Sequence, residues 1–349
     1  DSKVPGFFFL FSNINWNMGR LMDWMEEQKL TENTILIFMG DNGSSKGHRV
    51  FNAGMRGYKG TLWDGGHRVP CFIRWPNGDL GQPRDIDALT QCQDLLPTLI
   101  DLCNLEASSQ TSSRFDGASL AGLLKGNTGS LKDRMLVVQF GANPEKGDAT
   151  VLWNKWRLVK GKLYNIRKDP HQDSNVTGEN PKVVKKMQQY YDKWWKQVQE
   201  PFNETRWIHL GNAKSNPMML YSSDWEGDYA DNRGNLIAGD RKGQWNVIVE
   251  QEGLYEFTLF RWWPLSDKLL DEAFNPDNNS DRGAVPIASA GIKIGDIEAK
   301  SDLPRDKEGA KSVSFTRHLE PGKYQLQTMF YDKNGNELCS AYYTRVEKK

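Results

Sequence analysis

The chain contains 349 residues, a length typical of about two domains and sufficient to bury a substantial core. Its 38% hydrophobic and 26% charged residues indicate a folded globular protein and exclude an intrinsically disordered one. The 45 basic residues equal the 45 acidic residues, which argues against a nucleic-acid-binding protein, because such proteins carry a basic excess or a basic stripe.

The apolar runs and the cysteines further restrict the class of protein to which the chain can belong. No apolar run reaches about 18 residues, so we expect no membrane-spanning segment. The four cysteines show no metal-binding spacing and do not suggest a disulfide framework. We therefore expect Cys71, Cys92, Cys103 and Cys339 to be buried free thiols.

Residues 1 to about 105 have the pattern of an α/β domain. Apolar residues at helical spacing predict an amphipathic helix over roughly residues 14–28. Residues 34–39 form an apolar run that predicts a fully buried strand, and residues 69–75 predict a second strand. The glycine-rich segment between them, residues 43–68, has no clear periodicity and indicates a long functional loop.

The next segments mix helices with short strands. An apolar face predicts a helix over about 89–103, in which Pro97 is tolerated in the first turn if Asp94 caps it. Residues 151–159 predict a hairpin that a further strand follows. A helix over about 181–199 carries a Tyr/Trp stripe, which we interpret as a contact with the core.

The pattern changes near Glu200. Beyond it, apolar and polar residues alternate, as at Trp245, Val247 and Val249, and glycines and Pro-Gly pairs mark turns. Several short strands with regular turns predict a β-sandwich or a barrel. We therefore predict a first domain at residues 1–200 and an all-β domain at residues 201–349.

The residues with the clearest chemistry follow the predicted buried strand. Asp41 and Asn42 come directly after it, and ligands of open α/β sheets bind beyond the carboxyl ends of strands. Their hard oxygen donors suit a hard cation. Lys59 lies in the glycine-rich segment 57–66, where the backbone can approach a ligand closely and the ammonium group can bind an oxyanion.

Each of these features alone has a simpler interpretation. Asp-Asn-Gly is a common turn, and lysines in glycine-rich loops are usually solvated. His48 and His67 lie in or near the same loop, and a solvated or structural histidine explains them equally well. The functional hypothesis therefore depends on the combination of Asp41, Asn42 and Lys59.

Together these segments resemble the sulfatases, including the arylsulfatases, of the alkaline-phosphatase-like superfamily. The resemblance covers about residues 13–198 and is most specific in the Lys-Gly-Thr-Leu-Trp-Asp-Gly-Gly run that starts at Lys59. It implies a partial alkaline-phosphatase-like α/β domain, followed by a β-sandwich like the one appended to some bacterial arylsulfatases. The matching segments lie at residues 17–24, 32–43, 57–70, 94–99, 116–120 and 163–170.

The resemblance also implies roles for particular residues. In that family Ca²⁺ is held by acidic residues of an N-terminal strand and by an Asp-Asn pair from a later strand, which matches Asp41 and Asn42. The family's lysine that contacts the substrate sulfate matches Lys59. The implied function is hydrolysis of sulfate esters of glycans or aryl compounds, in the periplasm or outside the cell. The substrate itself is not indicated, because the family's pocket uses variable loops.

The sequence departs from the family most decisively at the nucleophile. The family nucleophile is a formylglycine made from Cys or Ser in a Cys/Ser-x-Pro-Ser-Arg motif, and no such motif occurs here. The N-terminal acidic metal ligands and the family's active-site histidine are also missing. We therefore expect the chain to be the C-terminal portion of a sulfatase, inactive alone and a poor binder of Ca²⁺.

Two other functions remain open at this stage. One is a related phosphate or phosphonate ester hydrolase, which an upstream Thr or unmodified Ser nucleophile would distinguish. The other is a non-catalytic module whose sandwich binds sulfated glycans, for which tryptophans could form a platform. Core packing is the simpler interpretation of those tryptophans. They are Trp207, Trp225, Trp245, Trp262 and Trp263.

Overall fold

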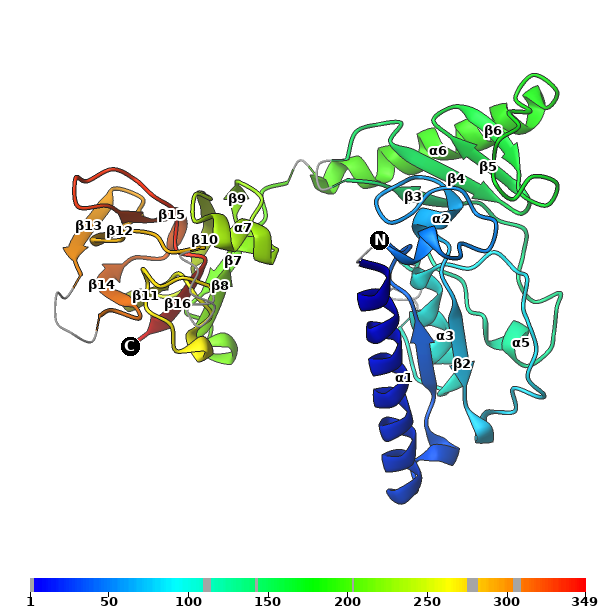
Figure 1. Cartoon of the computed structure of the whole chain (residues 1–349), viewed down its shortest axis with the longest axis horizontal. Helices are drawn as coiled ribbons and strands as arrows, with labels where there is room; N and C mark the ends of the chain where they lie inside the picture. The colour runs from blue at the N-terminus through cyan, green and yellow to red at the C-terminus, as the bar shows by residue number, and fades with distance from the viewer. Residues whose placement is uncertain (1–2, 109–113, 142–143, 203, 275–281, 304–308) are drawn as a thin grey trace. The chain divides into compact units, whose positions relative to one another are not determined.

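The computed structural model describes residues 3–108, 114–141, 144–202, 204–274, 282–303 and 309–349. The chain forms two compact units, Asp1–Glu200 (unit 1) and Pro201–Lys349 (unit 2), coloured blue to green and green to red in Figure 1. Unit 1 combines helices with sheets and unit 2 is dominated by strands, which confirms an α/β fold followed by a β-rich region. No helix among the described residues has the length and apolar character needed to cross a bilayer.

Unit 1 begins with a long helix and a two-stranded ribbon. Helix α1 (Lys3–Glu27) starts well before the predicted residue 14. Strands β1 (Leu36–Met39) and β2 (Cys71–Arg74) pair antiparallel, with Leu36 opposite Arg74. The prediction of a fully buried strand is wrong, because the residues of β1 are half-buried or exposed. Among the described residues β1 pairs only with β2, so apolar side chains of the ribbon reach solvent.

The segment between β1 and β2 is more ordered than the predicted irregular loop. It contains a 3-10 turn, η2 (Gly47–Arg49), and a single helical turn, α2 (Asp64–His67). Both are too short to show a helical periodicity in the sequence, which explains why the pattern indicated only a loop. Further 3-10 turns lie at η1 (Thr31–Asn33) and η3 (Pro76–Gly78).

The predicted helix around Pro97 is shorter than expected. It consists of a 3-10 turn, η4 (Cys92–Asp94), which runs into α3 (Leu95–Leu102), and α5 (Ala121–Leu124) follows later in the chain. Pro97 lies in the first turn of α3, as predicted. The predicted cap is wrong, since the Asp94 side chain does not cap α3 and instead accepts hydrogen bonds from Gln91 N and Ala118 N, both at 2.8 Å.

A four-stranded antiparallel meander completes unit 1. Its order is β3-β4-β5-β6, and helix α6 (Pro181–Phe202) packs along it (Figure 1). Met187 and Tyr191 of α6 are buried against Leu163 and Val151 of the sheet, which confirms the predicted contact of the Tyr/Trp stripe with the core. The strands are β3 (Leu136–Gln139), β4 (Ala149–Trp153), β5 (Trp156–Val159) and β6 (Lys162–Asn165).

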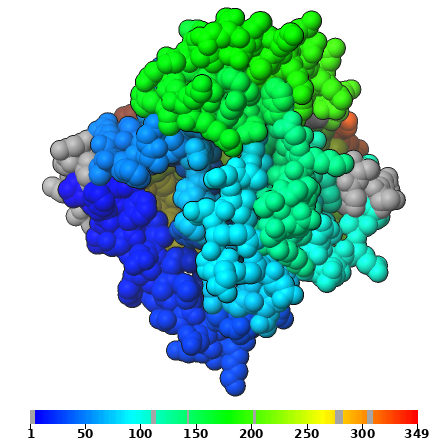
Figure 2. Space-filling model, turned by 90° about the vertical axis from the view of Figure 1, so that its right-hand side faces the viewer, coloured from blue at the N-terminus to red at the C-terminus, as the bar shows by residue number. Residues whose placement is uncertain are grey.

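Figure 2 shows unit 1 as a surface, with this green meander and its helix lying against the cyan and blue N-terminal half. Buried contacts join the two parts. The Thr150 hydroxyl of β4 donates to the Leu62 carbonyl at 2.6 Å, and Arg157 of β5 forms an ion pair with Asp64. The glycine-rich segment is therefore supported by the meander.

The cysteines are free, as expected, but only Cys339 is buried. Cys71, Cys92 and Cys103 are exposed, so the prediction of buried thiols is wrong for these three. Each stands at the end of an element, at the start of β2, at the start of η4 and just after α3, where the chain leaves the packed face. Burial raises the pKa of the Cys339 thiol to about 11.

Unit 2 is built from two sheets. The larger has the order β13-β12-β15-β10-β7, with β9 also paired to β10, and the smaller has the order β14-β11-β16-β8. All pairs are antiparallel except β7 with β10, which are parallel. The larger sheet contains β7 (Ile208–Leu210), β9 (Glu226–Gly227), β10 (Gly243–Val249), β12 (Ser289–Ile294), β13 (Ile297–Asp302) and β15 (Gly322–Tyr331).

The two sheets of unit 2 share one hydrophobic core. Trp245 and Val247 of the larger sheet and Phe257 and Leu259 of the smaller sheet are all fully buried in it, which confirms that the apolar residues of the alternating pattern face the core. The polar Asn246 between Trp245 and Val247 is buried as well. The smaller sheet contains β8 (Met218–Tyr221), β11 (Gly253–Phe260), β14 (Val313–Leu319) and β16 (Tyr343–Lys348). The short helices are η5 (Ala213–Ser215), η6 (Ser222–Asp224), α7 (Arg233–Ala238) and η7 (Pro264–Ser266).

The tryptophans do not form a single exposed platform. Trp225, Trp245 and Trp262 are buried, which confirms core packing for these three. Trp263 is 40% exposed and stacks on Tyr221 with ring centroids 6.1 Å apart.

Candidate functional site

The segment after β1 lies against the glycine-rich segment. Gly43 N donates to the Gly66 carbonyl at 2.9 Å, and Lys59 N approaches the Ser44 carbonyl at 3.5 Å. A Cβ atom on Gly43 would collide with the Gly65 carbonyl oxygen, so the close approach requires glycine there. These backbone contacts bring the Asp41–Gly43 turn and the Lys59 loop together, although they are separated in the sequence.

All three predicted site residues have exposed side chains. Asp41 and Asn42 follow the end of β1, and Asn42 Nδ2 donates to Asp41 Oδ2 at 2.8 Å, so these two side chains lie on the same side of the turn. Lys59 is placed near the turn through its backbone, and its ammonium group is open to solvent. A ligand can therefore reach all three residues.

Asp41 and Asn42 offer the kind of donors that a hard cation requires. A carboxylate and a carboxamide oxygen suit Ca²⁺, which takes six to eight oxygen ligands. Within the described part of the chain, Asp41 belongs to no group of three or more His, Cys, Asp or Glu residues close enough to share an ion. The pair fits one side of a Ca²⁺ shell and supplies only part of it.

A buried ion pair holds the glycine-rich segment in place. Arg157 Nε of β5 lies 2.9 Å from Asp64 Oδ1 of α2, and both side chains are almost fully buried. Gln172 binds the same segment twice: its Oε1 accepts from Asp64 N, and its carbonyl accepts from Arg56 Nη1, both at 3.0 Å. The Arg56 guanidinium also lies over the Trp63 ring, 3.8 Å from its centroid.

Sequence reasoning missed Arg157 and Gln172 as residues that position the loop. They lie about a hundred residues beyond it, and a single sequence contains no signal that pairs them with Asp64. Removing either Asp64 or Arg157 would leave the other as an uncompensated buried charge, which would destabilise the folded protein.

The two histidines near the loop differ in role. His67 is part of the support, because its Nε2 lies 3.3 Å from the Leu62 carbonyl and its burial lowers the pKa of the imidazole. His48 stacks on Tyr58 with ring centroids 4.6 Å apart. Its Nδ1 also lies 3.2 Å from the Ser44 carbonyl, which places it where the two loops meet.

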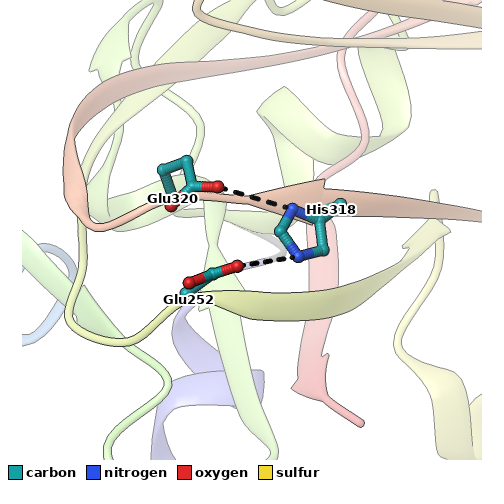
Figure 3. Close-up of side chains that lie close together, drawn as sticks. All are labelled: Glu252, His318 and Glu320. Atoms are coloured by element: carbon teal, nitrogen blue, oxygen red, sulfur yellow. Dashed lines mark ion pairs between the residues drawn. The ribbon is translucent and has the colours of Figure 1, made fainter.

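A second group of titratable residues lies in unit 2, far along the chain from Asp41. Glu252, His318 and Glu320 are exposed, and their ligand atoms lie within 4.8 Å of one another. The His318 ring faces both glutamates (Figure 3), with Nε2 3.4 Å from Glu252 and Nδ1 3.9 Å from Glu320. Because each ring nitrogen faces a different carboxylate, the arrangement is that of a surface ion pair, and such exposed pairs contribute little to stability.

Comparison with known proteins identifies the relatives of this chain. Residues 10–105 match the family model described as Sulfatase. The steryl-sulfatase of Mus musculus is 33% identical over 122 residues, which cover 33% of this chain and 19% of that protein. The segment at residues 10–105 is similar to the sulfatases. An N-acetylgalactosamine-6-O-sulfatase of Bacteroides thetaiotaomicron is 26% identical over 204 residues, which cover 50% of this chain and 39% of that protein.

The sulfatase-like segment contains all three predicted site residues. Asp41, Asn42 and Lys59 lie within residues 10–105. The chain spans less than half the length of the curated relatives it matches, including 44% of the arylsulfatase K of Xenopus laevis. Among solved structures, that of Ps i-CgsB aligns with 50% of this chain and 39% of its own chain, at 24% identity and a TM-score of 0.43.

Proposed function

We propose that this chain contributes to the active centre of a sulfatase, which hydrolyses a sulfate ester with water to an alcohol and inorganic sulfate. The observation that carries the proposal is the junction of two loops within the sulfatase-like segment. The turn that contains Asp41 and Asn42 is held against the loop of Lys59 by the Gly43–Gly66 and Lys59–Ser44 backbone contacts. The Lys59 ammonium group suits an anionic ester, whereas the oxygens of Asp41 and Asn42 suit a cation.

The exposed Lys59 ammonium group would bind the sulfate group. Its charge would oppose the negative charge that develops on the sulfate oxygens and the leaving oxygen as the ester bond breaks. The support from Arg157 and Gln172 keeps the backbone of the loop in one conformation, so that less order has to be imposed when the ester binds.

Asp41 and Asn42 would hold a Ca²⁺ ion from one side. The hydrogen bond between them orients both side chains before any ion binds. When bound, the ion would supply Lewis-acid polarisation of a sulfate oxygen. We propose sulfated glycans or aryl sulfates as the substrate class, and the glycan alternative is supported by the Bacteroides relative, which is named for a sulfated amino sugar. We propose the periplasm or the cell exterior as the location.

The test is turnover of 4-nitrophenyl sulfate and of sulfated oligosaccharides by the protein that carries this chain. Lys59→Ala should lower kcat/KM by about 10²–10³-fold, the usual loss when one charge-stabilising donor is removed. Lys125→Ala, at an exposed lysine just after α5, is the matched control and should leave turnover unchanged. Equal turnover by the Lys59→Ala and Lys125→Ala variants would refute the role of Lys59.

The cation assignment has a separate readout. Ca²⁺ should raise the Tm of the wild-type protein relative to EDTA, because a ligand that binds only the folded state stabilises it. Asp41→Ala should abolish this rise, whereas Asp23→Ala in the exposed part of α1 should retain it. A rise that survives Asp41→Ala would place the ion elsewhere.

A further inference from the structure

Unit 2 has a groove of about 790 Å³ on the solvent face of its larger sheet. Most of its lining residues come from neighbouring strands of that sheet, from β13 through β12, β15 and β10 to β9, and Lys242, Glu337 and Ser340 line it from outside these strands. The volume lies within the range of roughly 300–1,000 Å³ that is typical of ligand-binding clefts. No part of the proposed sulfatase centre in unit 1 lines it.

A row of polar side chains crosses the groove, one from each strand. The strand registers place these residues opposite one another in turn. Lys293 and Gln327 are each flanked by buried residues of their strands and are themselves exposed, so they point away from the core, and directly paired residues lie on the same face of the sheet. Gln327 Nε2 donates to Gln244 Oε1 at 2.8 Å, and Lys293 pairs with Glu298 at 2.6 Å. The row reads Glu298, Lys293, Gln327, Gln244, Glu226.

A glycine creates the hollow beside this row. Gly291 is paired with Met329 on one side and Lys300 on the other, so the floor has no side chain at its centre. A Cβ atom at Gly291 would lie 3.1 Å from the Tyr331 ring. The Lys300 ammonium lies over that ring, 3.8 Å from its centroid, and these two residues form a wall of the groove.

The charges along the groove balance. Three lysines are matched by three glutamates, and two of the lysines are already paired, Lys293 with Glu298 and Lys242 with Glu337. A polyanion would meet three carboxylates here, and an apolar protein surface would have to desolvate the row without replacing its hydrogen bonds. A ligand with many hydroxyl groups can both donate to the carboxylates and amide oxygens and accept from the ammonium and amide groups.

We propose that this groove binds an uncharged oligosaccharide segment that lies across the strands. The alternating carboxylate, ammonium and carboxamide groups match the hydroxyls of successive sugar rings, and Met329 beside Gly291 offers an apolar floor. The site is distinct from the exposed Trp263–Tyr221 pair, which does not line the groove. The inference does not depend on the proposed sulfatase function, because it uses no residue of unit 1.

Isothermal titration calorimetry of the full chain with agarohexaose, mannohexaose and cellohexaose tests the proposal. At least one of these neutral hexasaccharides should bind, with a Kd that changes less than about twofold between 50 mM and 500 mM NaCl, since no net charge is matched. A carrageenan hexasaccharide tests the sulfated alternative. Failure of all three neutral probes, or binding of the sulfated one alone, would overturn the proposal.

Variants locate the site. Gln327→Ala removes a member of the polar row at an exposed position and should weaken binding at least tenfold without changing the Tm. Gly291→Leu should abolish binding by filling the hollow, with the Tm checked because its side chain presses on Tyr331. Ser314→Ala on the other sheet and Trp263→Ala are controls that should keep the wild-type Kd. Loss of binding with Trp263→Ala but not with Gln327→Ala would place the sugar on the aromatic pair and contradict the groove.

Discussion

Asp94 ties together three segments of unit 1 through its buried carboxylate. Its oxygens accept hydrogen bonds from the backbone of Gln91 and Ala118 and from the Arg134 guanidinium, whose Nη1 lies 2.7 Å from Oδ1. The pattern around Pro97 had suggested a helix cap, which is a local role. The contacts instead join residues up to 40 positions apart, so the carboxylate links segments that are distant in the sequence.

Replacing Asp94 should destabilise unit 1 strongly. Asp94→Ala removes the carboxylate that pairs with the half-buried Arg134 guanidinium, which retains its hydrogen bond to the Leu89 carbonyl, and it removes the acceptor of the Gln91 and Ala118 N–H groups. We expect a loss of about 3–5 kcal/mol in the free energy of unfolding. Urea denaturation followed by tryptophan fluorescence measures it. Asp101→Ala, at an exposed position of α3, is the control and should change the value by less than about 0.5 kcal/mol. Equal losses of unfolding free energy in Asp94→Ala and Asp101→Ala would contradict this role of Asp94.

The lowered pKa of Asp94 predicts how the stability of unit 1 changes in acid. Burial opposes ionisation of Asp94, but the hydrogen bonds from Arg134, Ala118 and Gln91 outweigh it, and the pKa in the folded state is lowered from 3.8. The unfolded state therefore binds the proton more readily. The stabilisation is complete above about pH 4 and is lost as pH falls through the lowered pKa of the folded state. Urea denaturation between pH 2 and pH 6 should show this decline in the wild type and a shallower one in Asp94→Asn.

At the scale of elements, α6 shows how an amphipathic pattern becomes a core. Met187 is fully buried and Tyr191 nearly so, while their neighbours on the opposite face remain exposed. The helix period predicts both which face is apolar and that it must be covered. The covering partner is the meander β3–β6, of which the sequence predicted the hairpin at residues 151–159 and the strand after it, but not its packing against α6.

Truncation of the buried methionine tests this packing. Met187→Ala should cost about 2–5 kcal/mol, because it removes apolar contacts and leaves a cavity against Leu163. The adjacent exposed residue provides a matched control, and Gln188→Ala should cost less than about 0.5 kcal/mol. Thermal and urea unfolding measure both. A Met187→Ala protein as stable as the control would show that α6 does not pack on the sheet as described.

At the scale of the whole molecule, each hydrophobic cluster lies within one unit. The large cluster around Trp245 and Phe257 belongs entirely to unit 2, and the clusters around Met187 and Leu62 belong to unit 1. A core that is complete within one unit should support folding of that unit alone.

Residues 204–349 expressed alone should therefore fold cooperatively. We expect a near-UV circular dichroism spectrum of packed aromatic side chains and a single urea transition, because the tryptophans of the core remain buried. Trp245→Ala in the same fragment is the comparison and should lose about 3–5 kcal/mol. A fragment without near-UV signal or without a cooperative transition would show that unit 2 requires residues outside it.

Unit 1 exposes large apolar side chains on its N-terminal helix and its two-stranded ribbon. Phe9, Phe11 and Trp16 of α1 are more than half exposed, and so is Phe72 of β2. Surfaces of this kind bind hydrophobic dyes or partners. The full chain should therefore enhance the fluorescence of 8-anilinonaphthalene-1-sulfonate, and the double variant Phe9→Glu and Phe11→Glu should reduce the enhancement at least twofold. A Leu210→Val control within the core of unit 2 should leave it unchanged.

Local pattern was sufficient for much of the architecture. The hairpin near Trp153, the helix α6, the alternating strands of unit 2 and the turn of Asp41 and Asn42 were all predicted from residues close in sequence. Periodicity reports which side chains must be buried, and these elements satisfy that requirement with partners nearby. The position of strand β1 was predicted correctly, but its exposure to solvent was not, because the burial of a strand depends on what covers it and not on its own apolar residues.

Only the tertiary structure decided how the candidate site and the groove are assembled. The amino-acid order by itself specified an acidic turn, a lysine in a glycine-rich loop and a likeness to the sulfatases. Only the fold brought that turn against that loop, used Arg157 and Gln172 to support it, and arranged five separate strands into a polar groove. The physical reason is that hydrogen bonds and ion pairs between distant segments depend on positions in space, which no single-sequence periodicity encodes.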